Sequence, residues 1–284
     1  MKRKRKFSVS LCLKYASFAA AGIAALALVG ITLYILISGL PHVTWNFLFG
    51  KYVTSTTMAK DEVSIFPAIV STLILILLTL VVAIPLGVAA AVFLTEYTKP
   101  GSKFVKAIRL AVDTLTGIPS IVYGLFGALF FGYYLKLGSS ILTGTLTMAI
   151  VVLPTIIRAT EESIKTVPGM YREGSFALGA GKQKTVFKIV LPGALPGIIT
   201  SVILSVGRLI GESAAILLTI GYSAKYVVGS LTAPTTNLAG MVYFLTTEFK
   251  NEAKAASAVL LILVILLNIG ATLIGSRLQR KNKA

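Results

Sequence analysis

The sequence predicts an all-α integral membrane protein with six transmembrane helices and both termini in the cytoplasm. Its 284 residues are 56% apolar and only 13% charged, whereas soluble domains carry about 25% charged residues. Long runs of the chain contain no charged side chain, and most lysines and arginines gather in alternate loops between those runs. This composition excludes a water-soluble enzyme, a disordered linker protein and a secreted disulfide scaffold.

Six apolar segments are long enough to cross a bilayer core, which needs about 20 residues of helix. They lie near 15–37, 66–94, 117–135, 139–157, 196–220 and 255–275. Helices are favoured over strands because the segments are long and show no alternation of apolar and polar residues. The first segment follows a basic run at 2–6. Its apolar part exceeds the about 7–15 residues of a cleaved signal, so we expect an uncleaved anchor.

The distribution of positive charge sets the orientation. Twenty of the 27 lysines and arginines lie in the first 14 residues, in 94–116, in 158–195 and after the last span. Six lie in the alternate loops 38–65, 136–138 and 221–254. Because positively charged loops stay in the cytoplasm, both ends of the chain are predicted to be cytoplasmic. The net charge of +17 then reflects topology and suits anionic lipid headgroups. Its scatter over four loops argues against nucleic-acid binding.

The third segment carries small residues at every fourth position. Ser120, Gly124, Ala128 and Gly132 form a strip on one helix face, which lets another helix approach closely. The partner could be a helix of the same chain or one of a second subunit, and the sequence leaves both possibilities open.

The fifth segment holds two charges within an apolar stretch. On one continuous helix at 100° per residue, Ser201, Ser205, Arg208, Glu212 and Thr219 fall on one face. A charge near the bilayer centre costs at least about 2.5–3.5 kcal/mol and usually faces a bundle interior or a cavity. Either Arg208 and Glu212 form an ion pair that joins helices, or the guanidinium lines a pathway and meets an anion. Arginine four residues before glutamate is the poorer order for a helical pair. We therefore favour a substrate pathway lined by Arg208, Glu212, Ser205 and Ser201, with Glu212 holding the guanidinium in place.

The 158–195 loop is the longest internal loop on the cytoplasmic side. We expect short amphipathic helices at 161–167 and 172–190, broken at Pro168–Gly169 and again at Gly179–Gly181. Such a pattern is typical of a helix on the membrane surface. It is equally typical of a helix that docks into a groove of a cytoplasmic partner.

A resemblance favours the docking interpretation. Glu173–Gly179 (EGSFALG) and Ile189–Pro192 (IVLP) resemble the EAA signature of ABC-importer permeases: EAA, three residues, Gly, nine residues, then I-x-L-P. Gly174 and Ser175 stand where the signature has alanines. The resemblance implies an ABC type I importer (MetI-like) permease fold, whose loop forms coupling helices seated on a separate ATPase. The coupling residues it implies are Glu173, Ala177, Gly179, Leu191 and Pro192.

Other stretches narrow the resemblance to the permeases of phosphate importers. They are Leu94–Tyr97, Gly117–Gly124 and Gly207–Ala214. Leu153–Glu162 looks more like the A-type subunit (PstA) than the C-type subunit. The resemblance covers roughly 63–276. It implies the membrane-spanning permease subunit of an ATP-driven phosphate importer, multi-pass in the bacterial plasma membrane, that moves inorganic phosphate inward by alternating access. The alternatives are a permease for another oxyanion, sulfate or molybdate, and the C-type partner permease.

The resemblance also implies partners and a division of labour. We expect a C-type permease subunit, two cytoplasmic ATP-binding subunits and an extracytoplasmic phosphate-binding protein. The chain has no Gly-x-x-x-x-Gly-Lys-Ser/Thr loop, so ATP and Mg are expected to be used by the partner ATPase, and this chain is expected to be neither an enzyme nor a cofactor carrier. One cysteine, Cys12, and one histidine, His42, are too few for a metal centre or a catalytic nucleophile set.

The chain then divides into three parts. Residues 1–62 hold the basic N-terminus, the first transmembrane helix and an external loop. Residues 63–276 form the permease domain with its coupling loop at 158–195, and residues 277–284 form a basic cytoplasmic tail.

Overall fold

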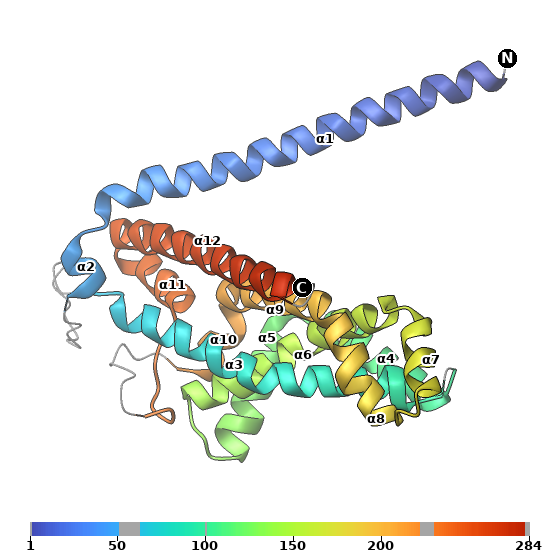
Figure 1. Cartoon of the computed structure of the whole chain (residues 1–284). Coiled ribbons are helices and arrows are strands. Elements are labelled where there is room, and N and C mark those ends of the chain that lie inside the picture. Colours follow the sequence, from blue (N-terminus) through green and yellow to red (C-terminus); the bar gives the residue numbers. More distant parts are fainter. Residues whose placement is uncertain (1, 51–62, 100, 222–229, 282–284) are drawn as a thin grey trace.

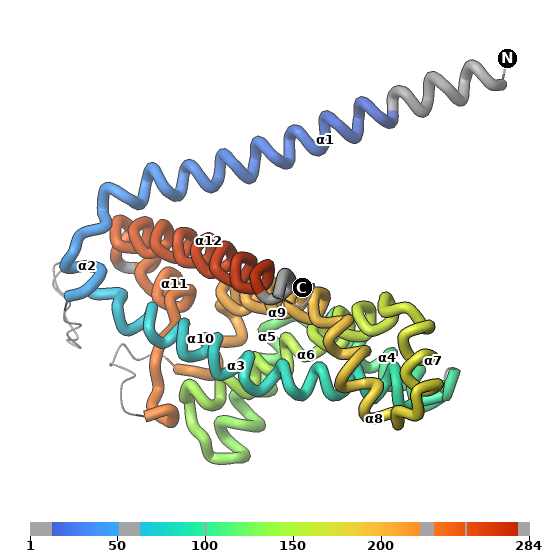
Figure 2. Tube along the Cα trace, in the orientation of Figure 1, coloured from blue at the N-terminus to red at the C-terminus, as the bar shows by residue number. Residues whose placement is uncertain are grey.

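The computed structural model describes residues 2–50, 63–99, 101–221 and 230–281, and the helices within them account for the architecture (Figures 1 and 2). The α-helices are α1 (Lys2–Gly39), α2 (Trp45–Phe49), α3 (Phe66–Val92), α4 (Lys103–Thr116), α5 (Ser120–Gly127), α6 (Ile141–Thr166), α7 (Gly169–Ala177), α8 (Lys182–Thr185), α9 (Leu191–Gly211), α10 (Ala214–Thr219), α11 (Leu238–Glu248) and α12 (Lys250–Lys281). Three π-helical turns, Phe93–Tyr97, Ala128–Tyr134 and Val186–Val190, extend α3 and α5 and lead into α9, and a 3-10 turn, Leu40–His42, follows α1.

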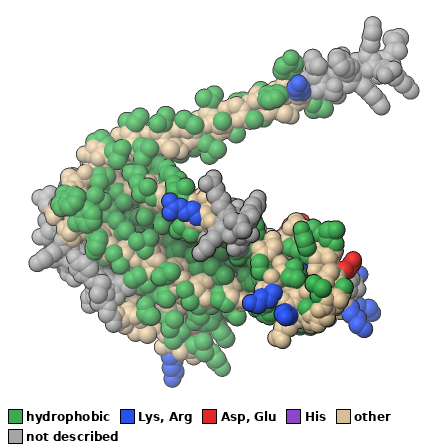
Figure 3. All heavy atoms as spheres, viewed as in Figure 1, with side chains coloured by type: hydrophobic (Ala, Val, Ile, Leu, Met, Phe, Trp, Pro, Cys, Tyr) green, Lys and Arg blue, Asp and Glu red, His purple; other side chains and the backbone are tan. Residues whose placement is uncertain are grey.

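Five helical segments in the described residues are long and apolar enough to cross a membrane. They are Leu13–His42, Phe66–Tyr97, Ile141–Thr166, Lys182–Gly211 and Lys250–Arg277. The pair formed by Lys103–Thr116 and Ser120–Tyr134 is bent by 102°, and counted as one span it makes six. Hydrophobic side chains cover most of the visible face, and many of the lysines and arginines in view lie at the end that holds α7 and α8 (Figure 3). The predicted all-α membrane architecture is confirmed.

Helix α6 is the centre of the bundle and packs between α3 and α9. In its most apolar stretch of 18 residues, 67% of the residues are buried. Met148, Val152 and Ile156 are fully buried. Glycines let the neighbours come close, since a Cβ on Gly87 of α3 would collide with Ile156 and one on Gly197 of α9 would collide with Ser163. The core therefore holds α3, α6 and α9 as one unit.

The small-residue strip of the third span packs inside the chain. A Cβ on Gly124 would lie 2.7 Å from the Cα of Ala215 in α10, and one on Gly132 would lie 3.3 Å from the carbonyl oxygen of Gly138. The sequence left open whether the strip contacts the same chain or a second subunit. At these two glycines, the contact is with the same chain.

The cytoplasmic segments differ from prediction in two places. The expected separate helix at 161–167 is wrong, because α6 runs without a break to Thr166 and ends two residues before Pro168, where a proline disfavours helical geometry in its neighbour. The 94–116 segment is not a plain loop either. It contains α4, whose Val105 and Val112 are buried while Phe104 and Leu110 are exposed.

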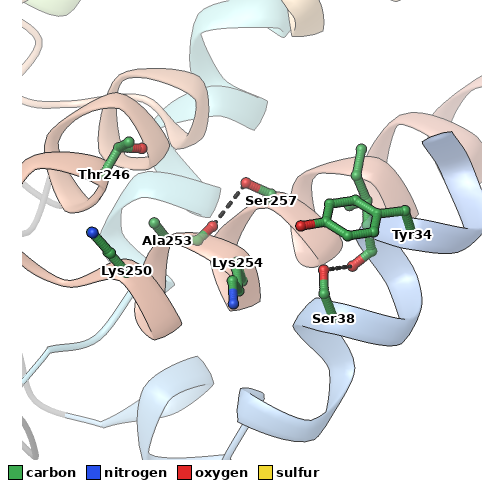
Figure 4. Close-up of a pocket in the computed structure, with 8 residues that line it drawn as sticks. Tyr34, Ser38, Thr246, Lys250, Ala253, Lys254 and Ser257 are labelled. Atoms are coloured by element: carbon green, nitrogen blue, oxygen red, sulfur yellow. Dashed lines mark hydrogen bonds between the residues drawn. The ribbon is translucent and has the colours of Figure 1, made fainter.

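The C-terminal end of α1 contacts the N-terminal part of α12, and the rest of α1 projects from the body (Figure 1). Gly39 makes that contact possible, since any Cβ there would strike the Lys254 carbonyl. Beside the contact lies a hollow of about 330 Å³ between α1 and the α11–α12 corner. Figure 4 shows Tyr34 and Ser38 on α1 facing Lys254 and Ser257 on α12 across it. This crevice lies toward the N-terminal end of α12 and is lined by none of the residues around Arg208.

Candidate functional site

The predicted continuous helix over 196–220 is wrong, and the point where it breaks defines the candidate site. Helix α9 ends at Gly211, Glu212 is extended with φ −80° and ψ 118°, and α10 begins at Ala214. Glycine and serine on either side of Glu212 lower the helical preference locally. Close packing of Ala215 against Gly124 then holds α10 in its own direction. Arg208 consequently lies in the last turn of α9, where a positive charge is favoured by the helix dipole.

Backbone groups freed by a break within a membrane span need partners, and such breaks occur where the backbone is buried in protein or lines a cavity. Here the Glu212 carbonyl accepts a 3.4 Å hydrogen bond from Nδ2 of Asn237. Asn237 also accepts from the Gly240 amide at 2.9 Å and so caps α11. Nearby, the Thr235 amide donates to the Ile220 carbonyl at the end of α10, at 3.0 Å. The outer segment before α11 thus holds the broken span.

Arg208 is half-buried and has few fixed partners. Its Nη1 donates to Oγ1 of Thr155 on α6 over 3.4 Å, a long and therefore weak hydrogen bond. The expected contact with Glu212 is not formed, because the break removes the i, i+4 geometry. No carboxylate within the described ranges lies within 4.0 Å of the guanidinium. The guanidinium therefore keeps donors available for an anion.

The two predicted serines occupy a different environment from Arg208. Ser201 and Ser205 are fully buried, and their hydroxyls donate to the carbonyls of Ile198 and Ser201 at 2.7 and 2.8 Å. Glu212, in contrast, is half-buried beside the break. A pathway role for Arg208, Glu212, Ser205 and Ser201 stays a prediction, and the geometry singles out Arg208. Within the described residues no group of three His, Cys, Asp or Glu side chains could hold a metal ion.

Three of the predicted coupling residues, Glu173, Ala177 and Gly179, lie on a helical hairpin at the cytoplasmic end, formed by α7 and α8, and the other two, Leu191 and Pro192, begin α9. Gly179 ends α7 with φ +80°, a conformation that favours glycine. Its amide donates to the Phe176 carbonyl at 2.9 Å and the Ala180 amide donates to the Ser175 carbonyl at 3.1 Å, the two bonds of a Schellman motif. This turn reverses the chain and sets the angle between α7 and α8.

The departure from the EAA signature has a local explanation. Ser175 is buried and its hydroxyl shares a 2.8 Å hydrogen bond with the hydroxyl of Thr185 on α8, so this serine closes the hairpin. A Cβ on Gly174 would meet no atom within 4 Å. The structure therefore accommodates the signature's alanine at 174, while the serine at 175 makes a contact that alanine cannot make.

The outer surface of the hairpin presents apolar side chains to the cytoplasm. Met170, Tyr171 and Phe176 are about half exposed or more, and Leu178 is 90% exposed. Exposed apolar patches of this kind mark interaction sites. Of the predicted coupling residues, Glu173, Ala177, Gly179 and Pro192 are exposed and Leu191 is half-buried. Their contact with an ATPase stays a prediction.

An ion pair that was not predicted fastens the hairpin to the spans. Arg172 of α7 donates from Nε and Nη2 to Oε1 of Glu96 at 3.1 and 2.7 Å. It also donates to the carbonyls of Ile164 and Val167 at 3.0 and 2.9 Å, at the end of α6. Both side chains are largely buried, at 20% and 12% exposure. The pair joins residues 76 positions apart, so the only sequence signal was one acidic residue at the end of a span and one basic residue in the loop.

With this geometry established, the chain can be placed in a family. Residues 83–284 match the family described as binding-protein-dependent transport system inner membrane component, and the chain belongs to it. Among relatives, a probable ABC transporter permease protein, YqgI of Bacillus subtilis, is 32% identical over 278 residues, 92% of this chain and 93% of that protein. The phosphate transport system permease protein PstA 1 of Mycobacterium tuberculosis is 31% identical over 281 residues, 96% of this chain and 90% of that protein.

Solved structures agree on the fold. The chain superposes on a permease chain of a bacterial alginate ABC transporter with a TM-score of 0.70, at 16% identity, covering 94% of this chain and 95% of the other. The predicted permease fold of ABC importers is confirmed. The chain is a multi-pass component of the inner membrane.

Proposed function

We propose that this chain is the membrane-spanning permease subunit of an ATP-driven phosphate importer. Relatives named as phosphate transport permeases match nearly the whole chain. The observation that carries the proposal within the molecule is the half-buried guanidinium of Arg208, without a carboxylate partner among the described residues, beside a break in a membrane span.

The chemistry of Arg208 suits an oxyanion in transit. The planar guanidinium fork donates two parallel hydrogen bonds to a tetrahedral anion and stays charged at any physiological pH. Glu212, directly after α9, reduces the positive electrostatic potential near Arg208, so phosphate binds there only weakly. A carrier needs this balance, because cargo that binds too tightly leaves slowly.

ATP hydrolysis belongs to other subunits in this proposal. Two cytoplasmic ATP-binding subunits, which use ATP and Mg, seat against the α7–α8 hairpin and its exposed apolar side chains. Closure of these subunits pushes the hairpin, and the Glu96–Arg172 pair carries the displacement to the ends of α3 and α6. A C-type permease subunit completes the pathway, and an extracytoplasmic phosphate-binding protein delivers the anion. The chain itself catalyses no reaction.

The proposal is tested by uptake of radiolabelled phosphate in a host without its own high-affinity system, with the partner subunits supplied. ATP-dependent uptake that arsenate blocks and sulfate or molybdate leaves unchanged is the expected result. Competition by sulfate or molybdate would transfer the assignment to another oxyanion. Absence of phosphate uptake by a correctly assembled complex would refute the substrate and leave the permease architecture in place.

A further inference from the structure

A second concentration of positive charge lies at the cytoplasmic end, away from Arg208. The turn after α3, helix α4 and the last turns of α6 enclose a hollow of about 280 Å³. Three cationic side chains line it, Lys99 from the turn, Arg109 from α4 and Lys165 from α6, together with Thr95 and Thr98. In Figure 1, α4 lies at the same end of the molecule as α7 and α8.

The hollow carries more positive than negative charge. Arg109 donates from Nε and Nη2 to Oε1 of Glu161 at 3.1 and 2.8 Å, and this carboxylate is only 5% exposed. Lys99 and Lys165 have no ion-pair partner among the described side chains, and Glu162, one turn before Lys165, is not within 4.0 Å of it. Two ammonium groups thus remain without a counter-charge. Like charges around one small space repel each other, and an anion between them relieves this repulsion.

Two other nearby carboxylates are already engaged elsewhere. Asp113 of α4 pairs with Arg158 of α6, and Glu96 pairs with Arg172 of α7. Neither compensates the hollow. The described carboxylates thus leave Lys99 and Lys165 available to an anion from outside the chain.

The lining selects the kind of anion. The hydroxyls of Thr95 and Thr98 donate to the carbonyls of Ala91 and Leu94, both at 2.7 Å, so the cationic groups supply the recognition. Buried Val105 and Leu94 form an apolar floor, and the exposed residues Lys99 and Lys165 lie at its rim. Ammonium and guanidinium donors around a space of this size suit a compact oxyanion with several acceptor oxygens. Basic pockets between helices at the cytoplasmic boundary also bind the phosphate headgroups of lipids.

We propose that Lys99, Arg109 and Lys165 form a binding site for a phosphate group at the cytoplasmic end of the chain. The group is either free inorganic phosphate or the headgroup of an anionic phospholipid. Because its three cations come from the α3–α4 turn, α4 and α6, the bound anion cross-links these elements. The site is separate from the proposed pathway and does not depend on the substrate assigned above.

The test measures binding by the assembled transporter, and transport is not its readout. The double variant Lys99→Gln/Lys165→Gln removes both unpaired charges. The matched control Lys103→Gln/Lys106→Gln removes two charges on α4 that are exposed, as Lys99 and Lys165 are, but do not line the hollow. One arm counts phosphatidylglycerol molecules that remain bound after detergent extraction, by native mass spectrometry. The other arm titrates inorganic phosphate into delipidated complex and follows its melting temperature.

We expect the control to bind as the unaltered protein does. The Lys99/Lys165 variant should bind about tenfold more weakly or worse, as the loss of a charge-assisted hydrogen bond implies. In the unaltered complex, retained phosphatidylglycerol without a change in melting temperature on adding inorganic phosphate assigns the site to lipid. A change in melting temperature that the control keeps and the Lys99/Lys165 variant loses assigns the site to the free anion. Equal binding by the two double variants would overturn the proposal. Since Arg208→Ala should leave this binding unchanged, a failure here is distinguishable from a failure of the import function.

Discussion

Arg208 is the single side chain on which the proposed pathway most depends. Arg208→Ala should lower phosphate uptake by roughly ten- to a hundredfold, because a hydrogen bond to a charged group contributes about 1.5–3 kcal/mol. Arg208→Lys keeps the charge but loses the two parallel hydrogen bonds of the guanidinium, so its uptake should lie between that of Arg208→Ala and that of the unaltered protein. Radiolabelled phosphate uptake measures both variants.

Assembly is the control for these variants. Arg208 makes one weak contact, to Thr155, so the complex should co-purify in normal yield without the guanidinium. Normal uptake by Arg208→Ala in an assembled complex would remove this residue from the pathway.

Ser175 provides a residue-level test of the hairpin. Ser175→Ala leaves the buried Thr185 hydroxyl without its side-chain partner and should destabilise the hairpin by about 0.5–1.5 kcal/mol. Gly174→Ala, one position earlier, has open space for its methyl group and should stabilise the helix by about 0.5–1 kcal/mol. Melting temperatures of the purified complex should therefore move in opposite directions. A decrease for both variants would contradict the assignment of the serine as the closing contact.

At the scale of elements, the turn between α7 and α8 can be tested with two glycines that differ in backbone geometry. Gly179 has φ +80°, whereas Gly181 has φ −69°, and a Cβ on either meets no atom within 4 Å. Gly179→Glu should cost about 1–2 kcal/mol of backbone strain and abolish uptake, because the angle of the hairpin changes. Gly181→Glu adds the same side chain without that strain and should transport. Uptake by both variants would argue against a fixed hairpin angle in coupling.

The Glu96–Arg172 pair is the second element-scale test. Glu96→Gln leaves Arg172 with its carbonyl contacts but without its charge partner. We expect phosphate moved per ATP hydrolysed to fall roughly tenfold, which corresponds to about 1.4 kcal/mol, while hydrolysis continues. Arg158→Gln is the matched control, because its pair with Asp113 is about half exposed and exposed pairs contribute little. Equal effects of the two variants would mean that the buried pair has no special part in coupling.

Prediction from sequence succeeded for those elements whose signal is local. Charge-free length located the spans, and Pro168 marked the end of the segment that became α6. The break at Glu212 was missed because a single glycine, such as Gly211, is common within membrane helices, and close packing of Ala215 on Gly124 decides the direction of α10. Helix α4 was missed because its charges identified it as a cytoplasmic loop, although Val105 and Val112, seven residues apart, carried a helical period.

For the whole molecule, the arrangement of spans makes one direct prediction. Six crossings place both ends of the chain on the same side of the membrane, and the charge distribution assigns that side to the cytoplasm. A fluorescent reporter fused after residue 284 should therefore be active in the cytoplasm, and a phosphatase fused there should be silent. The converse pattern would mean five crossings, with the bent α4–α5 pair failing to span.

The site was less predictable than the fold for a related reason. A helical wheel groups Ser201, Ser205 and Arg208 on one face, and all three lie on α9 before the break. It could not show that the serines are fully buried, nor that Glu212 lies outside ion-pair distance of Arg208. Contacts between distant segments, such as Arg172 with Glu96, follow from the packing of the entire bundle and leave no periodic trace in the chain.

The segment before α11 connects three parts of the molecule: α11, the break in the span at Glu212, and α3. Asn237 binds both the carbonyl of Glu212 at the break and the first turn of α11, and the next amide, of Leu238, donates to Thr72 of α3 at 2.9 Å. An external protein that displaced α11 would have to break the cap, the bridge to Glu212 or the bond to α3. A displacement of α11 would therefore be transmitted directly to the broken span and to α3.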